Sequence, residues 1–215
     1  MKKKIAIIGA GELGQQIAHL VEQGALYEIS GYYDDVATIG TVVGKYSVLG
    51  STNDLFSSFR ANEFDELIIG VGYNHFVERK KLFEKYSTQI PFASIIDSSC
   101  LVDYTARIGK GVVIYQGCII DRNVIIQDNV LLNLGVVVSH DSLIKSHSFI
   151  APRVAIAGFT EIGQCCNIGI NSTVIDHIKI ADNVCTGGGS VIIRDVVQSG
   201  LYVGNPLRKI DIDNK

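Results

Sequence analysis

One histidine in the sequence is followed directly by a carboxylate, His140 by Asp141, within a mostly apolar stretch. Imidazole can accept a proton near neutral pH, and a neighbouring carboxylate can orient the ring and raise its basicity. Such a pair could deprotonate an amine or alcohol while that group attacks an acyl carbon. Taken alone, an exposed histidine beside an ordinary aspartate is the simpler interpretation.

The other histidines carry weaker signals. His147 and His177 are expected in solvent, His147 at a corner of the chain and His177 beside an aspartate. His75 follows Asn74 near a predicted nucleotide site and could contact a phosphate. His19 belongs to a predicted helix.

A second group of residues could bind a phosphate. Gly9, Gly11 and Gly14 follow an apolar run with G-x-G-x-x-G spacing, and Asp34 lies twenty residues beyond Gly14. This is the fingerprint of an NAD-binding turn. A dinucleotide domain needs two mononucleotide halves, and the segment before residue 93 holds one. We therefore expect one nucleotide, with its pyrophosphate at the helix N-terminus and its base or ribose near Asp34 and Asp35. The alternative is that the glycines merely make a tight turn.

The composition limits the classes of function. The 215 residues carry a net charge of −3 without a basic run, which argues against nucleic acid as a partner. No stretch reaches the ~20 apolar residues of a membrane helix. The lysines at residues 2–4 precede too short an apolar run for a signal peptide, so we expect a cytoplasmic protein without membrane insertion. The five cysteines form no C-x-x-C pair, which predicts no metal and favours reduced, buried thiols over a cysteine nucleophile.

A six-residue repeat of aliphatic residues indicates which structural elements position these residues. From residue 102 to residue 192, fifteen of sixteen positions spaced six apart are Ile, Val or Leu. Helices give spacings of three and four, and isolated strands give two. The positions are Val102, Ile108, Ile114, Ile120, Ile126, Leu132, Val138, Ile144, Ile150, Ile156, Ile162, Ile168, Val174, Ile180, Thr186 and Ile192.

A period of six predicts a parallel β-helix with three short sides to a turn. Residues eighteen apart then stack, and their strands pair in parallel at about 4.8 Å. The position two residues before each aliphatic anchor is small or branched, as an inward position requires. Gly109, Gly163 and Gly169 directly follow anchors, and we assign them to corners that need a positive φ.

The first ninety residues predict a short α/β domain. Strands are expected at residues 5–8, 29–33 and 67–71, with one helix ending near Gln23 and another around Arg79. The predicted domains are residues 1–92, an α/β mononucleotide-binding (half-Rossmann) domain, and residues 93–215, the β-helix.

The repeated aliphatic–glycine hexapeptide and the closing Gly204-Asn205-Pro206-Leu207-Arg208-Lys209-Ile210 resemble the left-handed β-helix acyltransferases. With the preceding α/β domain, the chain is similar to the sugar O- and N-acetyltransferases of that group. The resemblance implies a left-handed coil, acetyl-CoA as co-substrate, no metal and a homotrimer. It also implies direct transfer to the 4-amino group of a nucleotide-linked 4-amino-4,6-dideoxy sugar.

The resemblance also implies roles for individual residues. His140 would be the general base and Asp141 its partner. The amide of Gly158, which the eighteen-residue stacking places directly above His140, would stabilise the oxyanion. Asn133 would hold the sugar or His140, or be an ordinary corner residue. Nucleotide-sugar contacts are implied for Gly11, Glu12, Leu13, Asp34, Asp35 and Gly72. Contacts to CoA are implied for Phe149, Ile170 and Gly188.

Other functions stay open at this point. O-acetylation of a sialic acid type of sugar would use the same base with a hydroxyl acceptor. A non-catalytic, nucleotide-binding β-helix scaffold would need none of the chemistry, and an NAD-dependent enzyme is the least favoured reading. The residues do not distinguish UDP, dTDP and GDP, the sugar epimer or longer acyl groups.

Overall fold

A computed structural model describes residues 2–72 and 74–210. The chain forms two compact units that divide between residues 95 and 96. Phe92 forms a bridge with Leu67, and the Ala93 N–H donates to the Leu67 carbonyl at 2.9 Å. Residues 92 and 93 therefore extend the sheet of the first unit.

The first unit is built on a five-stranded sheet of order β3-β4-β2-β1-β5. Strands β4, β2, β1 and β5 pair in parallel, and β3 joins β4 as an antiparallel hairpin. The centre of β1, Ile5 to Ile8, is almost completely buried, as an aliphatic run in a covered parallel sheet should be. The strands are β1 (Lys3–Ile8), β2 (Tyr27–Tyr33), β3 (Val42–Val43), β4 (Tyr46–Gly50) and β5 (Glu66–Ile69).

The helices of this unit are α1 (Glu12–Gln23), α2 (Leu55–Arg60) and α3 (Phe76–Tyr86), with a 3-10 turn at Thr52–Asp54. Helix α1 buries Leu13, Ile17 and Val21, which recur at the spacing of one helical face. The expected strands and both expected helices are present. The hairpin β3–β4, the 3-10 turn and α2 had no counterpart in the sequence-based prediction.

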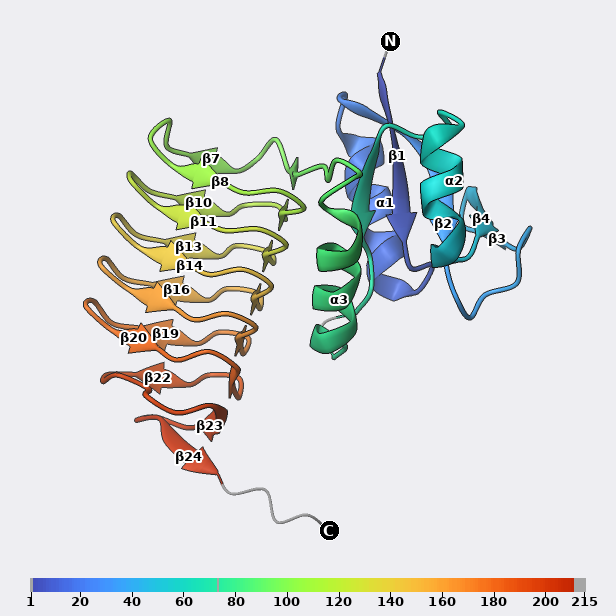
Figure 1. The fold of residues 1–215 in the computed structure, drawn as a ribbon. Coiled ribbons are helices and arrows are strands. Elements are labelled where there is room, and N and C mark those ends of the chain that lie inside the picture. The colour runs from blue at the N-terminus through green and yellow to red at the C-terminus, as the bar shows by residue number, and fades with distance from the viewer. Residues whose placement is uncertain (1, 73, 211–215) are drawn as a thin grey trace. The chain divides into compact units, whose positions relative to one another are not determined.

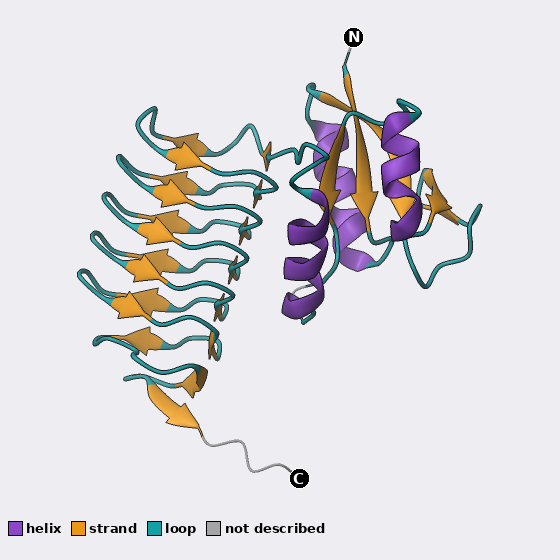
Figure 2. Cartoon of the chain, viewed as in Figure 1, coloured by secondary structure: helices purple, strands orange, loops and turns teal. Residues whose placement is uncertain are grey.

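The second unit is a parallel β-helix. Ile119 pairs with Val137, and Val137 with Ala155, so each coil takes eighteen residues as the period predicted. Figure 1 shows the coils stacked from β7 to β22, and Figure 2 shows strands joined by loops, with no helix in residues 96–210. The strands are β6 (Ile95–Ile96), β7 (Leu101–Val102), β8 (Arg107–Ile108), β9 (Val113–Ile114), β10 (Ile119–Ile120), β11 (Ile125–Ile126), β12 (Leu131–Leu132), β13 (Val137–Val138), β14 (Leu143–Ile144), β15 (Phe149–Ile150), β16 (Ala155–Ile156), β17 (Glu161–Ile162), β18 (Asn167–Ile168), β19 (Thr173–Val174), β20 (Lys179–Ile180), β21 (Val184–Thr186) and β22 (Val191–Ile192).

The anchor side chains form the core of this unit. From Ile114 to Ile192 every anchor is buried, whereas Val102 in the first coil remains 36% exposed. Small polar residues enter the core because their hydroxyls bind main-chain groups of other coils. Ser148 Oγ donates to the Gly163 carbonyl at 2.8 Å and accepts from the Cys166 N–H at 3.0 Å, so its burial leaves no unpaired polar atom.

The corners differ from the prediction in one respect. Gly109, Gly163 and Gly169 do not have a positive φ. A Cβ on Gly163 would lie 2.6 Å from the Ala181 carbonyl oxygen of the next coil, so glycine permits close approach of adjacent coils there. The positive φ falls two residues later, once per side, at Gly111, Gly117, Asn123, Asn129, Gly135, Asp141, His147, Arg153, Phe159, Cys165, Asn171, His177, Asn183 and Gly189.

The last coil ends in a hairpin. Strand β23 (Gly200–Val203) pairs in parallel with β21, and β24 (Arg208–Ile210) pairs antiparallel with β23. The residues between them include Gly204, with a φ of 99°. This segment was singled out in the sequence for its likeness to the closing motif of the acyltransferases.

Candidate active site

The corner between β13 and β14 carries His140 and Asp141. Asp141 adopts a φ of 58°, a left-handed conformation that aspartate tolerates better than most residues. Its Oδ2 lies 3.0 Å from His140 Nδ1. The His140 main-chain N–H faces Asp121 Oδ2 at 3.3 Å, and the imidazole is 37% exposed. The two neighbours in sequence therefore form a contact in space with the ring open to solvent.

The Asp141 carboxylate is held in its charged form. A hydrogen bond from Asn123 Nδ2 at 2.9 Å is the main cause that lowers the pKa of Asp141, followed by the contact with His140. Arg122 adds a weaker attraction from 3.8 Å. An ionised carboxylate can only accept hydrogen bonds, so His140 Nδ1 must carry the proton of this pair. In the neutral imidazole, Nε2 is then left with a lone pair for a substrate proton.

Gly158 lies against the imidazole, one coil beyond His140. A Cβ built on Gly158 would be 2.8 Å from His140 Cε1 and 3.0 Å from Nε2. Ordinary carbon contacts begin near 3.5 Å, so only glycine leaves this ring position free. Among the described residues, none accepts a hydrogen bond from the Gly158 N–H. The position combines an open donor with the nearby Nε2 lone pair.

Two residues after an anchor, the main-chain N–H is bound at some corners of the coil and unbound at others. At Leu134 and Gln164 a side-chain oxygen from Asn133 or Asp182 accepts the corresponding N–H at 2.7 Å. No acceptor among the described residues serves the N–H groups of Gly158, Ile170 and Gly188. These three donors are the ones that the sequence resemblance had assigned to substrate or cofactor. Among the described residues, Tyr104, Asp128, Asp176, Asp182 and Arg194 also lack an acceptor for this N–H.

Ile170 and Gly188 share the corner that leads from the β18–β21 side into the β19–β22 side. A Cβ on Gly188 would lie 3.0 Å from Ile170 Cγ2 and 3.4 Å from its carbonyl oxygen. Phe149 is a buried residue of β15, before that corner. Ile170 and Gly188 are thus adjacent, while Phe149 belongs to a strand.

Asn133 occupies the corner between β12 and β13. Its Oδ1 accepts the N–H of Leu134 at 2.7 Å, which is the work of an ordinary corner asparagine. His140 follows β13 and lies at the next corner of the coil. The side-chain oxygen of Asn133 therefore has a defined partner in its own turn, and among the described residues the Asn133 side chain forms no hydrogen bond with His140.

His147 and His177, two of the other histidines, differ in how far they are exposed to solvent. His147 was expected in solvent but is 6% exposed, and its Nδ1 lies 3.0 Å from Asn129 Nδ2. His177 is largely exposed beside Asp176, as expected. Its ring stacks on Phe159, whose own ring meets His140 edge-on at 5.2 Å between centroids.

The five cysteines are all free thiols. Cys118 and Cys166 are buried in inward positions, as expected, whereas Cys100, Cys165 and Cys185 are partly exposed. Burial raises the pKa of Cys166 to about 12, which makes it a poor nucleophile. A hydrogen bond with Cys118 lowers the pKa of Cys100 to about 7.

A hollow of about 770 Å³ lies at the carboxyl ends of β1 and β2 in the first unit. Six residues predicted to bind the nucleotide-sugar line it: Gly11, Glu12, Leu13, Asp34, Asp35 and Gly72. Sequence reasoning had not assigned Val36, Thr52, Glu78, Lys81 and Leu82 to this site, although they also line it.

The glycine turn leaves room for a ligand. Gly9 has a φ of 98° and turns the chain sharply after β1. Gly14 cannot carry a Cβ because that atom would collide with the Gly9 carbonyl oxygen. A Cβ on Gly11 or Gly72 would meet nothing within 4 Å. Gly11 also precedes α1 without a side-chain cap, so the first N–H groups of the helix can face an anion.

The acidic pair is engaged within the chain. Asp34 accepts hydrogen bonds at 2.8 Å from the N–H groups of Ala10, Val36 and Ala37. Burial acts to raise the pKa of Asp34, but these three donors outweigh it and lower the pKa. Asp35 binds the N–H and hydroxyl of Thr52. Both carboxylates therefore shape the rim of the hollow, and a ligand could use only their remaining lone pairs.

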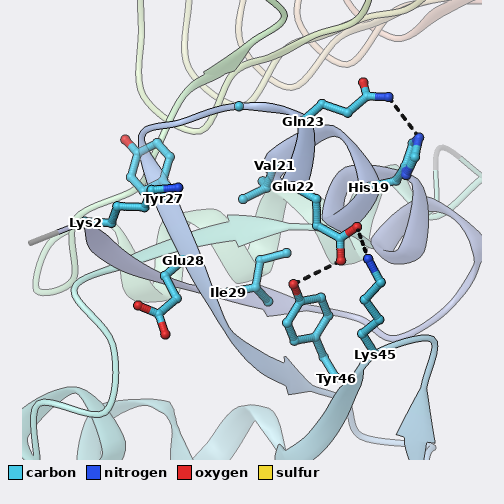
Figure 3. A pocket seen from close by; sticks show the side chains of 11 residues that line it. Lys2, His19, Val21, Glu22, Gln23, Tyr27, Glu28, Ile29, Lys45 and Tyr46 are labelled. Carbon is cyan, nitrogen blue, oxygen red and sulfur yellow. Dashed lines mark hydrogen bonds and ion pairs between the residues drawn. The ribbon is translucent and has the colours of Figure 1, made fainter.

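A second hollow of the first unit lies near the end of α1 and the start of β2 (Figure 3). Several of its polar side chains bind one another. Glu22 accepts from Lys45 Nζ at 2.9 Å and from the Tyr46 hydroxyl at 3.0 Å. His19 and Gln23 form a further pair at 3.0 Å. This hollow contains none of the residues predicted to bind a ligand.

No group of three or more His, Cys, Asp or Glu side chains in residues 2–72 and 74–210 is arranged to hold a metal ion. In the same part of the chain, each helix is too short or too polar to traverse a lipid bilayer.

Comparison with known proteins gives consistent likenesses. Residues 4–86 match the family model of the PglD N-terminal domain. The acetyltransferase domain of PglB from Neisseria gonorrhoeae, solved with acetyl coenzyme A, is 28% identical with a TM-score of 0.89, covering 98% of this chain and all of that one. PerB from Caulobacter crescentus, solved with CoA and GDP-perosamine, is 25% identical with a TM-score of 0.88, covering 97% of each chain.

A curated relative matches over a shorter stretch. UDP-3-O-acylglucosamine N-acyltransferase of Bordetella pertussis is 40% identical over 65 residues, which are 30% of this chain and 18% of that protein. The stacked eighteen-residue coils and the likeness to these solved acetyltransferases give the chain the fold of the hexapeptide-repeat acyltransferases. Within that class, the chain is similar to the left-handed β-helix sugar acetyltransferases, the family that the sequence resembled.

Sequence reasoning missed the polar surroundings of His140. Asn123 lies seventeen residues before His140 in the sequence, yet it binds the carboxylate beside the imidazole. The eighteen-residue stacking could have found it, because Asn123 plus eighteen is Asp141. Val36 and Lys81 carried no such spacing, since their places depend on how separate loops meet around the hollow.

Proposed function

We propose that the protein is an acetyl-CoA-dependent N-acetyltransferase acting on the 4-amino group of a nucleotide-linked 4-amino-4,6-dideoxy sugar. The observation that carries the proposal is the constellation of His140, Asp141 and Gly158. An imidazole with a carboxylate on Nδ1 lies beside an unbound main-chain N–H. These are the base and the oxyanion donor that acyl transfer requires.

In the proposed reaction, the sugar amine attacks the thioester carbon while His140 Nε2 accepts a proton from the nitrogen. The charge that develops on the carbonyl oxygen is stabilised by the Gly158 N–H. Asp141 stabilises the imidazolium electrostatically. The carbon–sulfur bond then breaks, the imidazolium returns its proton to the CoA thiolate, and the products are an amide and free CoA. Transfer is direct, without an acyl-enzyme.

The ligands are assigned by analogy with the family. The hollow at Gly11 and Gly72 would take the nucleotide, with phosphate at the start of α1. Asn133 is retained as a sugar contact. Phe149, Ile170 and Gly188 would contact CoA, and the unbound N–H groups of the last two suit the amide carbonyls of its pantetheine arm. PglB was solved with acetyl-CoA, and PerB with CoA and GDP-perosamine, which supports both assignments.

The proposal includes a homotrimer in which the CoA groove lies between the β-helices of neighbouring subunits, working in the cytoplasm where acetyl-CoA is made. Leu101 and Ile119 stack on β7 and β10, with 66% and 43% of their surfaces exposed. Aliphatic surface of this kind is a candidate for contact between copies. Sedimentation or light scattering should give three times the monomer mass, and a monomer at assay concentration would contradict this part.

The decisive experiment follows free thiol release with acetyl-CoA and a panel of acceptors. We expect turnover with a nucleotide-linked 4-amino sugar and none with sialic acid; the reverse result would favour O-acetylation. His140→Ala should lose at least about a hundredfold in kcat, as expected for a lost general base, with CoA binding kept. Unchanged activity in that variant, or no activity in any arm, would favour a binding scaffold. A nucleoside diphosphate should raise the Tm, and NAD should not.

A further inference from the structure

A line of polar residues runs along the corner that carries the active histidine. Thr105, Asn123 and Asp141 occupy the same corner position on three successive coils, eighteen residues apart. Thr105 Oγ1 donates to Asp103 Oδ1 at 2.6 Å and accepts the Asn123 main-chain N–H at 2.8 Å. Asn123 Nδ2 then donates to Asp141 Oδ1 at 2.9 Å. Each member of the line fixes the next.

At the end of this line, the two carboxylate oxygens of Asp141 have different partners. Oδ1 of Asp141 is taken by Asn123, and Oδ2 is the oxygen that faces His140 Nδ1. A carboxylate with one oxygen fixed in this way cannot turn freely about its own axis. Arg122 also approaches Oδ2, but at 3.8 Å and with 62% of its side chain exposed, and such a pair contributes little. The Asn123 amide is therefore the main restraint on Asp141.

The imidazole is bounded on its other sides as well. Gly158 lies under the ring, and the Phe159 ring meets it edge-on. Phe159 is in turn stacked on His177 at 4.8 Å between centroids, with an angle of 10°. These contacts limit where the ring can lie, but none of them selects which nitrogen carries the proton. That selection depends on Asp141.

We propose that Asn123 is a positioning residue for acetyl transfer, which holds Asp141 so that His140 keeps its proton on Nδ1 and presents Nε2 to the substrate. The inference rests on the function proposed above. Asn123 does not touch the reacting atoms, and acts through Asp141. Its left-handed backbone, with a φ of 56°, and its bond to Thr105 place the amide where Asp141 needs it.

The test compares Asn123→Gly with Asn183→Gly. Both asparagines are exposed, and their φ values of 56° and 57° suit glycine equally. Asn183 lies at a corner remote from His140 in the coil, after β20. In the 215-residue chain, Asn123→Gly should lower kcat by about tenfold to a hundredfold with little change in either KM. Asn183→Gly should retain the parent kcat within about twofold.

A second readout is independent of turnover. Imidazole ¹⁵N shifts of His140, identified by their loss in His140→Ala, report which nitrogen is protonated. In the parent and in Asn183→Gly they should show the Nδ1–H tautomer, and in Asn123→Gly a mixture of both. Should the glycine variant not fold, Asn123→Asp keeps the corner conformation and sets a carboxylate against Asp141 Oδ1. That variant is expected to give the same mixture.

The outcomes separate the inference from the proposed function. Parental kcat in Asn123→Gly, or a lower kcat with the parental ¹⁵N pattern, would overturn the positioning role. A drop of equal size in Asn183→Gly would overturn it too, because the effect would then be general to corner asparagines. If His140→Ala keeps full turnover, the proposed base is wrong. The ¹⁵N comparison would still show whether Asn123 governs the tautomer.

Discussion

An alanine at position 158 would place a methyl group where the His140 ring now lies. The added Cβ would be 2.8 Å from Cε1 and 3.0 Å from Nε2, against an ordinary contact of about 3.5 Å. The backbone at Gly158 is not in the left-handed region, so alanine adds no strain there. The imidazole, which is 37% exposed on its solvent side, must therefore move.

The size of the effect follows from the distances. Relief of the contact requires the ring to retreat by about 0.5 Å or more, and a misplacement of about 1 Å in a catalytic group can cost about a hundredfold. We expect Gly158→Ala to lower kcat by about tenfold to a hundredfold, which corresponds to about 1.4–2.7 kcal/mol in the activation free energy. The main-chain N–H of residue 158 stays in place, so the loss in kcat comes from the displaced His140 imidazole.

The assay is initial-rate thiol release with acetyl-CoA and the amino sugar, together with thermal unfolding. Gly24→Ala is the matched control, because a Cβ on Gly24 would meet its nearest atom at an ordinary 3.5 Å. The control should keep both kcat and Tm. If Gly158→Ala has the same kcat as the unsubstituted protein, the reasoning is refuted, because the contact between position 158 and the His140 ring would then not affect the position of the base. A large drop in Tm for that variant alone would also count against it.

Three other changes test separate features. Gly11→Ala adds a methyl to open space, so Tm should hold while the Kd for a nucleoside diphosphate rises about tenfold; an unchanged Kd would remove Gly11 from the site. Because the pKa of Asp34 is lowered in the folded protein, its ionised carboxylate stabilises the fold above about pH 4, and this stabilisation is lost as the pH falls. In Asp34→Asn the free energy of unfolding should therefore depend less on pH between about pH 5 and 2. The same pH dependence as in the unsubstituted protein would contradict this prediction. Ile150→Ala in the β-helix core should cost about 2–5 kcal/mol in denaturant unfolding, and a cost under about 1 kcal/mol would argue against its core role.

The β-helix could be predicted from the sequence because its determinants repeat. The anchor ladder fixes which side chains face inward, and a fixed coil length turns sequence distance into spatial contact. This is why the sequence alone predicts that Gly158 lies against His140. The same eighteen-residue spacing pairs Asn123 with Asp141, although an asparagine has no reactive group that would mark it as a site residue in the sequence.

The rest depends on contacts that no spacing encodes. The β3–β4 hairpin and α2 lie between residues 35 and 66, where short strands and turns give little periodicity. The glycines after the anchors were assigned to positive φ, although Gly163 is needed for the close approach of Ala181. His147 looked like a solvent-exposed corner residue and is instead buried against Asn129. In each case tertiary packing decided the outcome.

The antiparallel strand β24 has a consequence for how the coil behaves in a crowded solution. A stack of parallel strands that stopped abruptly would present an unpaired edge to any other copy. Because β24 reverses direction on β23, the next layer could not continue the same parallel register there. Strand β24 is itself the edge of this sheet, so a further layer added there would have to pair with a strand that runs against the direction of the stack.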